Sequence, residues 1–530
     1  MAAREGYTPP IVTPQRIFVY SCAAVFAAAL VRLVLFLAAP IDQQIGLIPD
    51  DAFYYLVPAR HFAELGRWTF DGVAPATGFH LLYGYLLAGL FALAPRIGDP
   101  ALFGVSAGTE TLLFCASAAL VARAVARDFG PPGALGVALA FTAPVALRQP
   151  TLLVESCFVL FAGSALLELF SRAGARAGPG LLAAAVALGL VGNLARSDFG
   201  IFPAAFFAAS LAAGRRAQAR LALAATLGAA LGVALVTLHA LHFSGSFLQG
   251  SARMKSHWAA LLGYDVRGLI RWLVDVIAPR DAKWVGTRPL ALVLLAGGAV
   301  GALRAFGDRA LRVPAWPLAA ASALSITGYV LLYGKTSSGV PPWYLANALP
   351  ALAYVMGGVA SWIPARAQLA ALGLTALWAA QNTATSLQPF LPHQAAMKNA
   401  GEYLRTHPDL GLAAAWNAGI VSWYAGRDVV NLDGLVNDDI YAHAVGQTLF
   451  DYVCERGVSV IVDYSEMIDN PALALRGGHA DGRLHRALRP LLDFTEDEPE
   501  LRWTDTDLWL WRVDRSTCAA SAASAGPRSP

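Results

Sequence analysis

The sequence predicts a polytopic α-helical membrane protein, with about 11–13 transmembrane helices and a small C-terminal α/β domain. Hydrophobic residues make up 56% of the 530 residues. Charged residues make up only 14%, well below the share of roughly one quarter that is typical of soluble proteins. Apolar runs of bilayer length also follow one another as far as residue 388 and then stop. The net charge of +3 is spread along the chain, so nucleic-acid binding has no support.

The apolar runs set the expected transmembrane helices. The first run is long enough to cross a bilayer and is not followed by a clear small-residue cleavage site, so we expect a helix and not a cleaved signal peptide. Many of the runs are rich in Ala, Leu and Gly, which favours close helix packing in lipid. We expect spans near residues 17–39, 79–96, 101–122, 132–147, 150–171, 179–195, 198–213, 221–242, 289–303, 314–333, 342–362 and 366–388.

The basic residues predict the orientation, because short cytoplasmic connections are enriched in Lys and Arg. They place the N-terminus in the cytoplasm of an inner (plasma) membrane protein, and the outer loops 40–78 and 243–288 and the C-terminal part outside. Arg123 and Arg127 break this parity, since two spans separate them from an outer loop. Either one of the spans 79–96 and 101–122 does not cross fully, or another division is wrong. The basic connections are Arg4 to Arg16, Arg172 to Arg176, Arg215 to Arg220, Arg304 to Arg312, and Arg366.

The composition changes near residue 388, where long apolar runs give way to alternating strand and helix patterns. We therefore divide the chain into a transmembrane catalytic domain (1–388), an extracytoplasmic α/β domain (389–515) and a disordered tail (516–530). Expected helices cover 396–405 and 438–455, and expected strands are LGLAAAW, 429–432, VSVIVDY and LWLWRV. Cys454 and Cys518 could pair if this part lies outside the cytoplasm.

Two adjacent acids, Asp50 and Asp51, stand where the first helix meets water. Adjacent carboxylates at a helix end repel one another and are costly to desolvate, which makes them the leading catalytic candidates. Tyr54 follows them, and His80 comes at the start of the second span. The alternative is an interfacial loop with solvated acids, one of which caps a helix, and with tyrosines in an aromatic belt.

Further ionisable residues are predicted at the same outer face, although they come from distant parts of the chain. Glu155, Arg196 and Asp198 could contact an acceptor or form a buried salt bridge. A basic group could bind a phosphate, because fixed cations stabilise the charge of a departing phosphate, or could only meet lipid headgroups. This group consists of Arg253, Lys255 and His257, with Lys335 and Tyr344 as weaker members.

Metal binding is left open by the sequence. Asp50, Asp51 and Glu155 could hold a divalent cation through oxygen ligands, but no closed ligand set is visible. In the C-terminal part, an Asx-rich stretch surrounds Gly434 and fits either a sugar or calcium site or an ordinary turn with a helix cap. Its members are Asn431, Asp433, Asn437, Asp438 and Asp439. EF-hand spacing and nucleotide-binding glycine motifs are absent from the sequence.

These pieces, in this order, resemble the GT-C class of membrane glycosyltransferases over roughly the first 390 residues. The likeness is greatest to the bacterial branch of arabinofuranosyltransferases and protein mannosyltransferases. It rests on PDDAFYY, TFDGVAPATGFHLLYGYLL, TLLVESCF, LARSDFGIF, SARMKSHW and PPWYLANALP. The resemblance implies that donors are polyprenyl-phosphate sugars. It also implies that Asp50 acts on the acceptor hydroxyl as general base while Asp51 helps to position acceptor or metal.

The predicted function is transfer of a sugar from a polyprenyl phosphate to an extracytoplasmic glycan, lipid or protein. A carboxylate with a raised pKa suits the proton transfer that such an attack requires. The sugar, the acceptor and the choice between inverting and retaining transfer are not indicated by the sequence. The alternative is a transporter or flippase of a lipid-linked envelope intermediate. The sequence shows no inverted repeat and few ionisable residues near the membrane midplane, and both observations favour the transferase.

Overall fold

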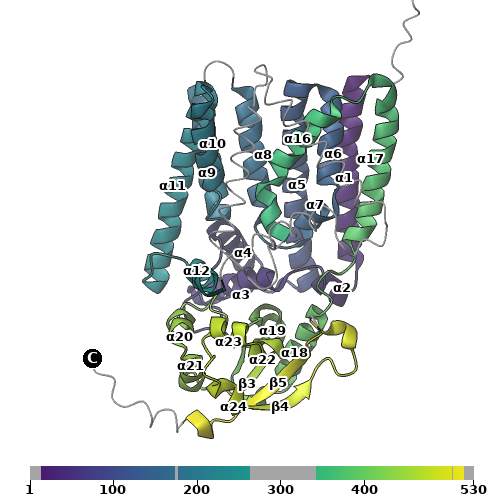
Figure 1. The fold of residues 1–530 in the computed structure, drawn as a ribbon. Coiled ribbons are helices and arrows are strands. Elements are labelled where there is room, and N and C mark those ends of the chain that lie inside the picture. The colour runs from purple at the N-terminus through teal and green to yellow at the C-terminus, as the bar shows by residue number, and fades with distance from the viewer. Residues whose placement is uncertain (1–12, 174–176, 263–341, 504, 519–530) are drawn as a thin grey trace, which may run out of the picture.

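The computed structural model describes residues 13–173, 177–262, 342–503 and 505–518. A bundle of helices stands on a smaller C-terminal domain that contains a sheet (Figure 1). The expected spans 289–303 and 314–333, and Lys335, lie outside the described residues. The main bundle helices are α1 (Pro14–Ala38), α5 (Asp99–Phe129), α6 (Ala134–Phe141), α8 (Ser156–Arg172), α9 (Pro179–Ala195), α10 (Ile201–Ala212), α11 (Arg216–Ser244), α16 (Leu349–Ala360) and α17 (Ala365–Ser386).

The described bundle confirms a polytopic helical protein. Three of its helices, α1, α5 and α11, are long and apolar enough to cross a membrane. A fourth candidate joins Pro144–Thr151 to Ser156–Arg172 across a bend of 117°. This candidate comprises α7 (Pro144–Arg148), the short 3-10 helix η2 (Gln149–Thr151) and α8, and Glu155 lies in the break between η2 and α8.

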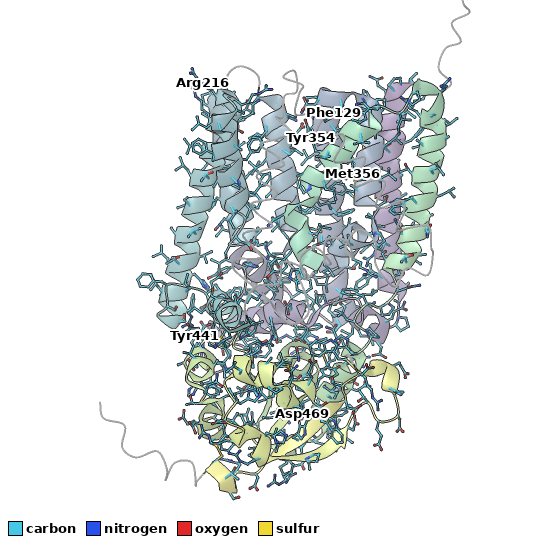
Figure 2. The ribbon with its side chains drawn as sticks, in the orientation of Figure 1. Phe129, Arg216, Tyr354, Met356, Tyr441 and Asp469 are labelled. Atoms are coloured by element: carbon cyan, nitrogen blue, oxygen red, sulfur yellow. A yellow bond between two sulfur atoms is a disulfide. The ribbon has the colours of Figure 1, made fainter. Side chains whose placement is uncertain are left out.

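The parity problem around Arg123 concerns the expected span 79–96, where the structure has the short helix α4 (Leu81–Leu93). This helix has 13 residues and is therefore about 20 Å long, short of the roughly 30 Å hydrocarbon core. It lies beside α3 (Asp50–Leu65) at the bundle end near the C-terminal domain (Figure 1). α5 then runs the length of the bundle, so Arg123 and Arg127 come to the far end. Figure 2 labels Phe129 and Arg216 at that same end.

Glycines allow two of the bundle helices to approach closely. A Cβ atom on Gly189 of α9 would lie 1.9 Å from the carbonyl oxygen of Ala225 in α11. One on Gly228 of α11 would lie 2.0 Å from the carbonyl oxygen of Val186. Small residues at both positions therefore bring the two backbones into direct contact, as in tightly packed transmembrane pairs.

The C-terminal domain is built on a five-stranded sheet with the order β2-β1-β3-β5-β4. β1 pairs in parallel with β2 and β3, whereas β5 pairs antiparallel with β3 and β4. The four predicted strands are confirmed, and β4 is an additional edge strand. The strands are β1 (Ala413–Ala415), β2 (Val429–Asn431), β3 (Val460–Tyr464), β4 (Leu488–Asp493) and β5 (Leu508–Val513).

Helices pack on the sheet, and several of them contact helices of the membrane domain. α18 (Gln394–Thr406) confirms one prediction, but the single helix expected over 438–455 is wrong. Two helices stand there, α20 (Ile440–Gly446) and α21 (Leu449–Glu455), because Gln447 adopts a left-handed conformation with φ of 54°. The other helices are α19 (Ala418–Ala425), α22 (Glu466–Asp469), α23 (Pro471–Gly477) and α24 (Arg483–Ala487). Cys454 and Cys518 form a disulfide, the pairing that the sequence left open.

Three helices lie at the level where the bundle meets the domain. They are α2 (Ile41–Ile45), α3 and α12 (Gly250–Leu262), and they come from the predicted outer loops 40–78 and 243–288. This junction contains the candidate site.

Candidate functional site

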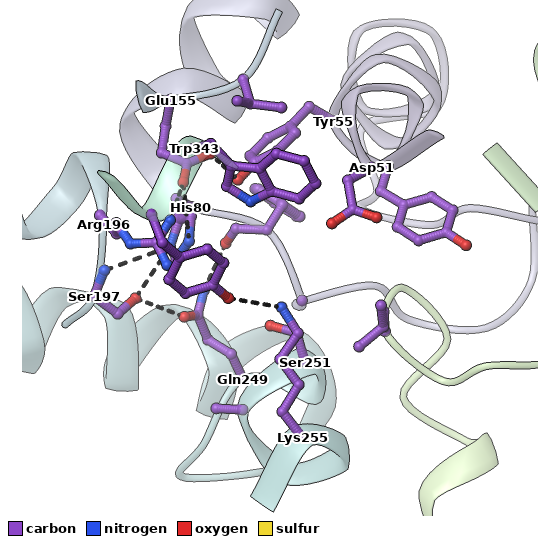
Figure 3. A pocket seen from close by; sticks show the side chains of 17 residues that line it. Asp51, Tyr55, His80, Glu155, Arg196, Ser197, Gln249, Ser251, Lys255 and Trp343 are labelled. Carbon is purple, nitrogen blue, oxygen red and sulfur yellow. Dashed lines mark hydrogen bonds and ion pairs between the residues drawn. The ribbon is translucent and has the colours of Figure 1, made fainter. Parts of the chain in front are cut away.

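A cavity opens at the junction, where segments far apart in the sequence meet (Figure 3). The first turns of α3, the approach to α4, the break before α8, the end of α9, the start of α12 and the 3-10 helix η3 (Pro342–Asn347) all contribute to its lining. The C-terminal domain contributes Leu435. The polar residues that line the cavity include Asp51, Tyr54, Tyr55, His80, Glu155, Arg196, Ser197, Gln249, Ser251, Lys255 and Tyr344.

The two adjacent acids have different environments. Asp51 lines the cavity, and no described residue donates a hydrogen bond to its carboxylate. Asp50 faces the C-terminal domain, where it accepts hydrogen bonds from the amides of Ile420 (2.7 Å) and Gly419 (3.2 Å) in the first turn of α19. Asp50 thus binds the start of a helix, where a carboxylate is favoured.

Burial controls the charge of both acids. It raises the pKa of Asp50 to about 7, with Asp51 adding to the effect and the Ile420 and Gly419 amides opposing it. Burial also raises the pKa of Asp51, against the lowering effect of the Lys255 ammonium. An acid whose pKa is brought towards neutrality is suited to accept a proton from a hydroxyl.

Glu155 is the centre of a fixed polar network. Its carboxylate accepts a hydrogen bond from the Tyr55 hydroxyl (2.6 Å) and one from Arg196 Nη1 (2.7 Å). Arg196 also binds Asp198, with 3.0 Å between Nε and Oδ1. The buried salt bridge that the sequence offered as an alternative is therefore present, and Glu155 holds Arg196 in the cavity wall.

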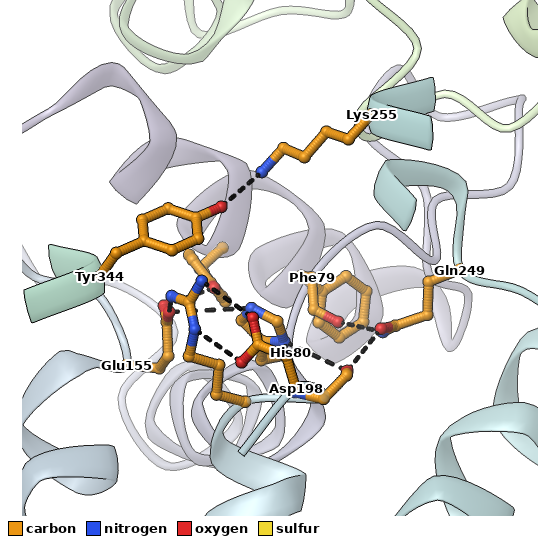
Figure 4. Close-up of polar contacts among 10 residues, drawn as sticks. Phe79, His80, Glu155, Asp198, Gln249, Lys255 and Tyr344 are labelled. Atoms are coloured by element: carbon orange, nitrogen blue, oxygen red, sulfur yellow. Dashed lines mark hydrogen bonds and ion pairs between the residues drawn. The ribbon is translucent and has the colours of Figure 1, made fainter. Parts of the chain in front are cut away.

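His80 joins this network as a neutral ring (Figure 4). Burial lowers the pKa of His80 to about 4. The Ser197 amide donates to Nδ1 at 3.4 Å, which leaves the ring hydrogen on Nε2, 3.7 Å from Glu155 Oε1. Ser197 also donates to Gln249 (2.8 Å), whose amide nitrogen donates to the carbonyl of Phe79 (2.6 Å). The start of α4 is thereby tied to the segment that leads into α12.

Lys255 supplies a cation to the cavity. Its Nζ donates to the Tyr344 hydroxyl at 3.3 Å. Burial lowers the pKa of Lys255, but Tyr344 and Asp51 outweigh this effect and the net pKa is raised, so the ammonium stays charged. The Tyr344 ring also stacks against the Arg196 guanidinium, 3.8 Å from the ring centre. A charged lysine opposite Asp51 is an arrangement that can receive an anionic leaving group.

Arg253 and His257, two residues of the predicted phosphate-binding group, lie outside the cavity lining. Arg253 does not line the cavity; its Nη2 lies 3.8 Å from Asp438 Oδ1, and its guanidinium lies over the Tyr441 ring at 5.0 Å. The His257 ring faces the same Tyr441 at 6.3 Å. Both residues therefore face the C-terminal domain, and of the members of the predicted group that the structure describes, Lys255 and Tyr344 line the cavity.

The Asx-rich stretch forms a structured loop that docks onto the membrane domain. Asp433 accepts hydrogen bonds from the Tyr54 hydroxyl (2.9 Å) and the Leu435 amide (2.7 Å). Asp438 accepts from the Thr77 hydroxyl (2.6 Å). Asn431 accepts from the Gly434 amide (3.0 Å) and donates to the Tyr54 hydroxyl (3.4 Å), and Asn437 donates to the Asn431 carbonyl (2.9 Å). The loop thus closes one side of the cavity with Leu435.

The carboxylates suggested for a divalent cation do not converge. Asp50 is bound by backbone amides, and Glu155 is engaged by Tyr55 and Arg196. No group of three or more His, Cys, Asp or Glu side chains is arranged to hold a metal within the described part of the chain. The proposed ligand set therefore does not fit a divalent ion.

Several lining residues were not predicted from the sequence. Tyr55, Ser197, Gln249, Ser251 and Trp343 are uncharged, so the pattern of ionisable residues in the sequence does not mark them. Trp343 adjoins the predicted Tyr344, so the aromatic pair in PPWYLAN was the signal available for it.

Comparisons with known proteins agree with this architecture. ArnT from Cupriavidus metallidurans, in its apo state, superposes with a TM-score of 0.55 at 15% identity, over 93% of this chain and 99% of that one. An Archaeoglobus fulgidus oligosaccharyltransferase, in complex with Zn and sulfate, superposes with a TM-score of 0.52 at 14% identity, over 87% and 71%. The chain has the GT-C fold.

The likeness in fold covers 93% of the chain, and a family model matches from the last part of α17 through most of the C-terminal domain. Residues 378–510 match a family described as "Domain of unknown function (DUF8728)". No curated protein matches the chain. The GT-C fold predicted from the sequence is confirmed by the likeness to these two structures.

Proposed function

We propose that this GT-C protein is a membrane glycosyltransferase that moves a sugar from a lipid-phosphate carrier to a hydroxyl-bearing glycan, lipid or protein in the cavity at Asp51. The observation that carries the proposal is the placement of a partly buried acid and a charged lysine in one cavity, supported by a fixed Glu155–Arg196 network. Glycosyl transfer needs both a proton acceptor for the attacking hydroxyl and a cation for the departing phosphate.

Asp51, Lys255 and Tyr344 each have a role in the proposed reaction. The acceptor oxygen attacks the anomeric carbon, and its proton passes to the Asp51 carboxylate. The bond between the anomeric carbon and the phosphate oxygen breaks, and the electron pair stays on the lipid phosphate. Lys255 stabilises that charge, with Tyr344 orienting the ammonium.

The geometry favours Asp51 over Asp50 as the base. Asp51 lines the cavity, whereas both oxygens of Asp50 accept amide hydrogens from α19. We therefore assign Asp50 to docking of the C-terminal domain. Catalysis by Asp50, the role implied by the family resemblance, stays a prediction that a variant comparison can test.

The proposed orientation places this cavity and the C-terminal domain outside the cytoplasm. The basic ends of α5 and α11 lie at the opposite end of the bundle, in agreement with the positive-inside rule. The Cys454–Cys518 disulfide supports the same orientation, because such bonds persist in oxidising compartments.

The test is transfer of radiolabelled sugar from a panel of polyprenyl-phosphate sugars by the purified protein in detergent. We expect transfer with at least one donor, and a reduced rate of that transfer in Lys255→Gln. A parallel measurement follows movement of lipid-linked sugar across vesicles that contain the protein. Lipid movement without transfer from any donor would contradict the proposal and favour the transporter.

A further inference from the structure

A groove lies at the bundle end opposite the C-terminal domain. There α1, α5 and the 3-10 helix η1 (Pro131–Gly133) form a shallow, open groove of about 520 Å³. One part of its lining is apolar and another is basic. The residues that matter are Phe18, Val19, Ala126 and Pro131 on the apolar part, and Arg123 and Arg127 on the basic part.

The basic part of the groove carries excess positive charge. Arg127, Arg172 and Arg123 converge on one carboxylate, Glu168, with nitrogen to Oε1 distances of 2.5, 3.0 and 3.6 Å. Three guanidinium groups therefore face a single buried acid. Arg123 makes the longest of these contacts and its side chain is 51% exposed. It can therefore bind a further anion with little loss of ion-pair energy to Glu168.

We propose that this groove binds one anionic phospholipid from the leaflet opposite the C-terminal domain. An acyl chain lies along Phe18, Val19 and Ala126, and the headgroup phosphate binds Arg123 and Arg127. The combination of an apolar channel with a basic rim matches a phospholipid, whose two ends have these properties. This site is separate from the proposed transfer cavity and does not depend on the function assigned there.

The charge pattern also argues against the chain's own N-terminal residues as the occupant. The sequence before residue 13 carries one charged side chain of each sign, Arg4 and Glu5, so it brings no net negative charge to the arginines. An anionic lipid supplies that charge directly.

The test uses the full-length protein in a neutral detergent. Thermal unfolding is followed during titration with phosphatidylglycerol, phosphatidylcholine or inorganic phosphate, each added separately. We expect phosphatidylglycerol to raise the melting temperature more than phosphatidylcholine, and inorganic phosphate to leave it unchanged. Arg123→Gln should weaken apparent binding of phosphatidylglycerol about fivefold, the effect of one surface cation on an anionic lipid.

Two further variants separate this groove from general surface charge. Arg220→Gln removes an exposed arginine near the start of α11, at the same bundle end but outside the groove, and should leave lipid binding unchanged. Ala126→Trp fills the apolar part without changing charge and should weaken binding as Arg123→Gln does. Equal stabilisation by the two lipids, equal loss in Arg220→Gln, or unchanged binding in Ala126→Trp would each overturn the proposal.

Discussion

Substitution of Gly78 by alanine should separate the C-terminal domain from the transfer cavity. A Cβ atom at Gly78 would lie 1.5 Å from the carbonyl oxygen of Leu435 and 3.0 Å from the Ser251 amide nitrogen. Because non-bonded atoms need roughly 3.5 Å, the Leu435 loop would have to retreat by about 2 Å. The contact is with backbone, so rotation of a side chain cannot relieve it.

The size of the effect on docking follows from the hydrogen bonds that hold the Leu435 loop against the membrane domain. Retreat breaks the hydrogen bonds from the Asp438 amide to the Pro75 carbonyl (2.9 Å) and from the Thr77 hydroxyl to Asp438 (2.6 Å). Each buried hydrogen bond contributes about 1 kcal/mol, so docking should weaken by about 2 kcal/mol. Since a misplacement of 1 Å can lower a catalysed rate about 100-fold, we expect a loss of transfer of that order.

The assay compares sugar transfer in the wild-type protein, in Gly78→Ala and in Gly89→Ala. Gly89 belongs to α4, where an added Cβ meets nothing within 4 Å, so this control should retain activity. Gly250→Ala introduces a similar clash with the same loop, at a residue that does not line the cavity. Its Cβ would lie 1.8 Å from Asp438 Oδ1. Hydrogen exchange of the Leu432–Asp438 amides reports docking. Full transfer by Gly78→Ala, with those amides still protected, would refute the reasoning.

Three further results are expected. Lys255→Gln should move the acid limb of the pH–rate profile to higher pH, because loss of the ammonium removes the effect that lowers the pKa of Asp51; an unchanged limb would contradict that coupling. Tyr55→Phe should reduce transfer about tenfold with the fold retained, because Glu155 loses its 2.6 Å hydrogen bond, and circular dichroism is the control. Asp463→Asn should lower the free energy of unfolding of the C-terminal domain by about 2–3 kcal/mol in denaturant titration, because four N–H groups donate to that carboxylate; an unchanged midpoint would contradict this role.

Seven of the residues that the sequence proposed for the site line the cavity, but the sequence did not separate Asp51 from Asp50, or Lys255 from its neighbours on the same helix. Consecutive residues on an α-helix point about 100° apart, and on α3 this turns Asp50 towards the amides of α19 while Asp51 lines the cavity. The same periodicity divides α12. Arg253 and His257 are four residues apart and share the face towards the C-terminal domain, whereas Lys255 projects from the opposite face into the cavity.

The parts of the C-terminal domain that the sequence did not predict depend on tertiary contacts. α19 is a short, almost wholly buried helix whose first amides are bound by Asp50, some 370 residues earlier in the chain. β4 contains Pro490 and lies at the sheet edge, where a missing amide hydrogen is tolerated. Neither element has the local hydrophobic period that predicts a helix or strand from sequence alone.

The most direct test of the proposed function compares single substitutions at the two adjacent acids. Asp51→Asn should abolish sugar transfer, a loss of at least about 100-fold, while the protein keeps its melting temperature. Asp50→Asn should retain transfer whenever the C-terminal domain stays docked, and should lower the melting temperature through the lost charge at α19. Retained transfer in Asp51→Asn, together with complete loss in a fully docked Asp50→Asn protein, would contradict the assignment of Asp51 as the base.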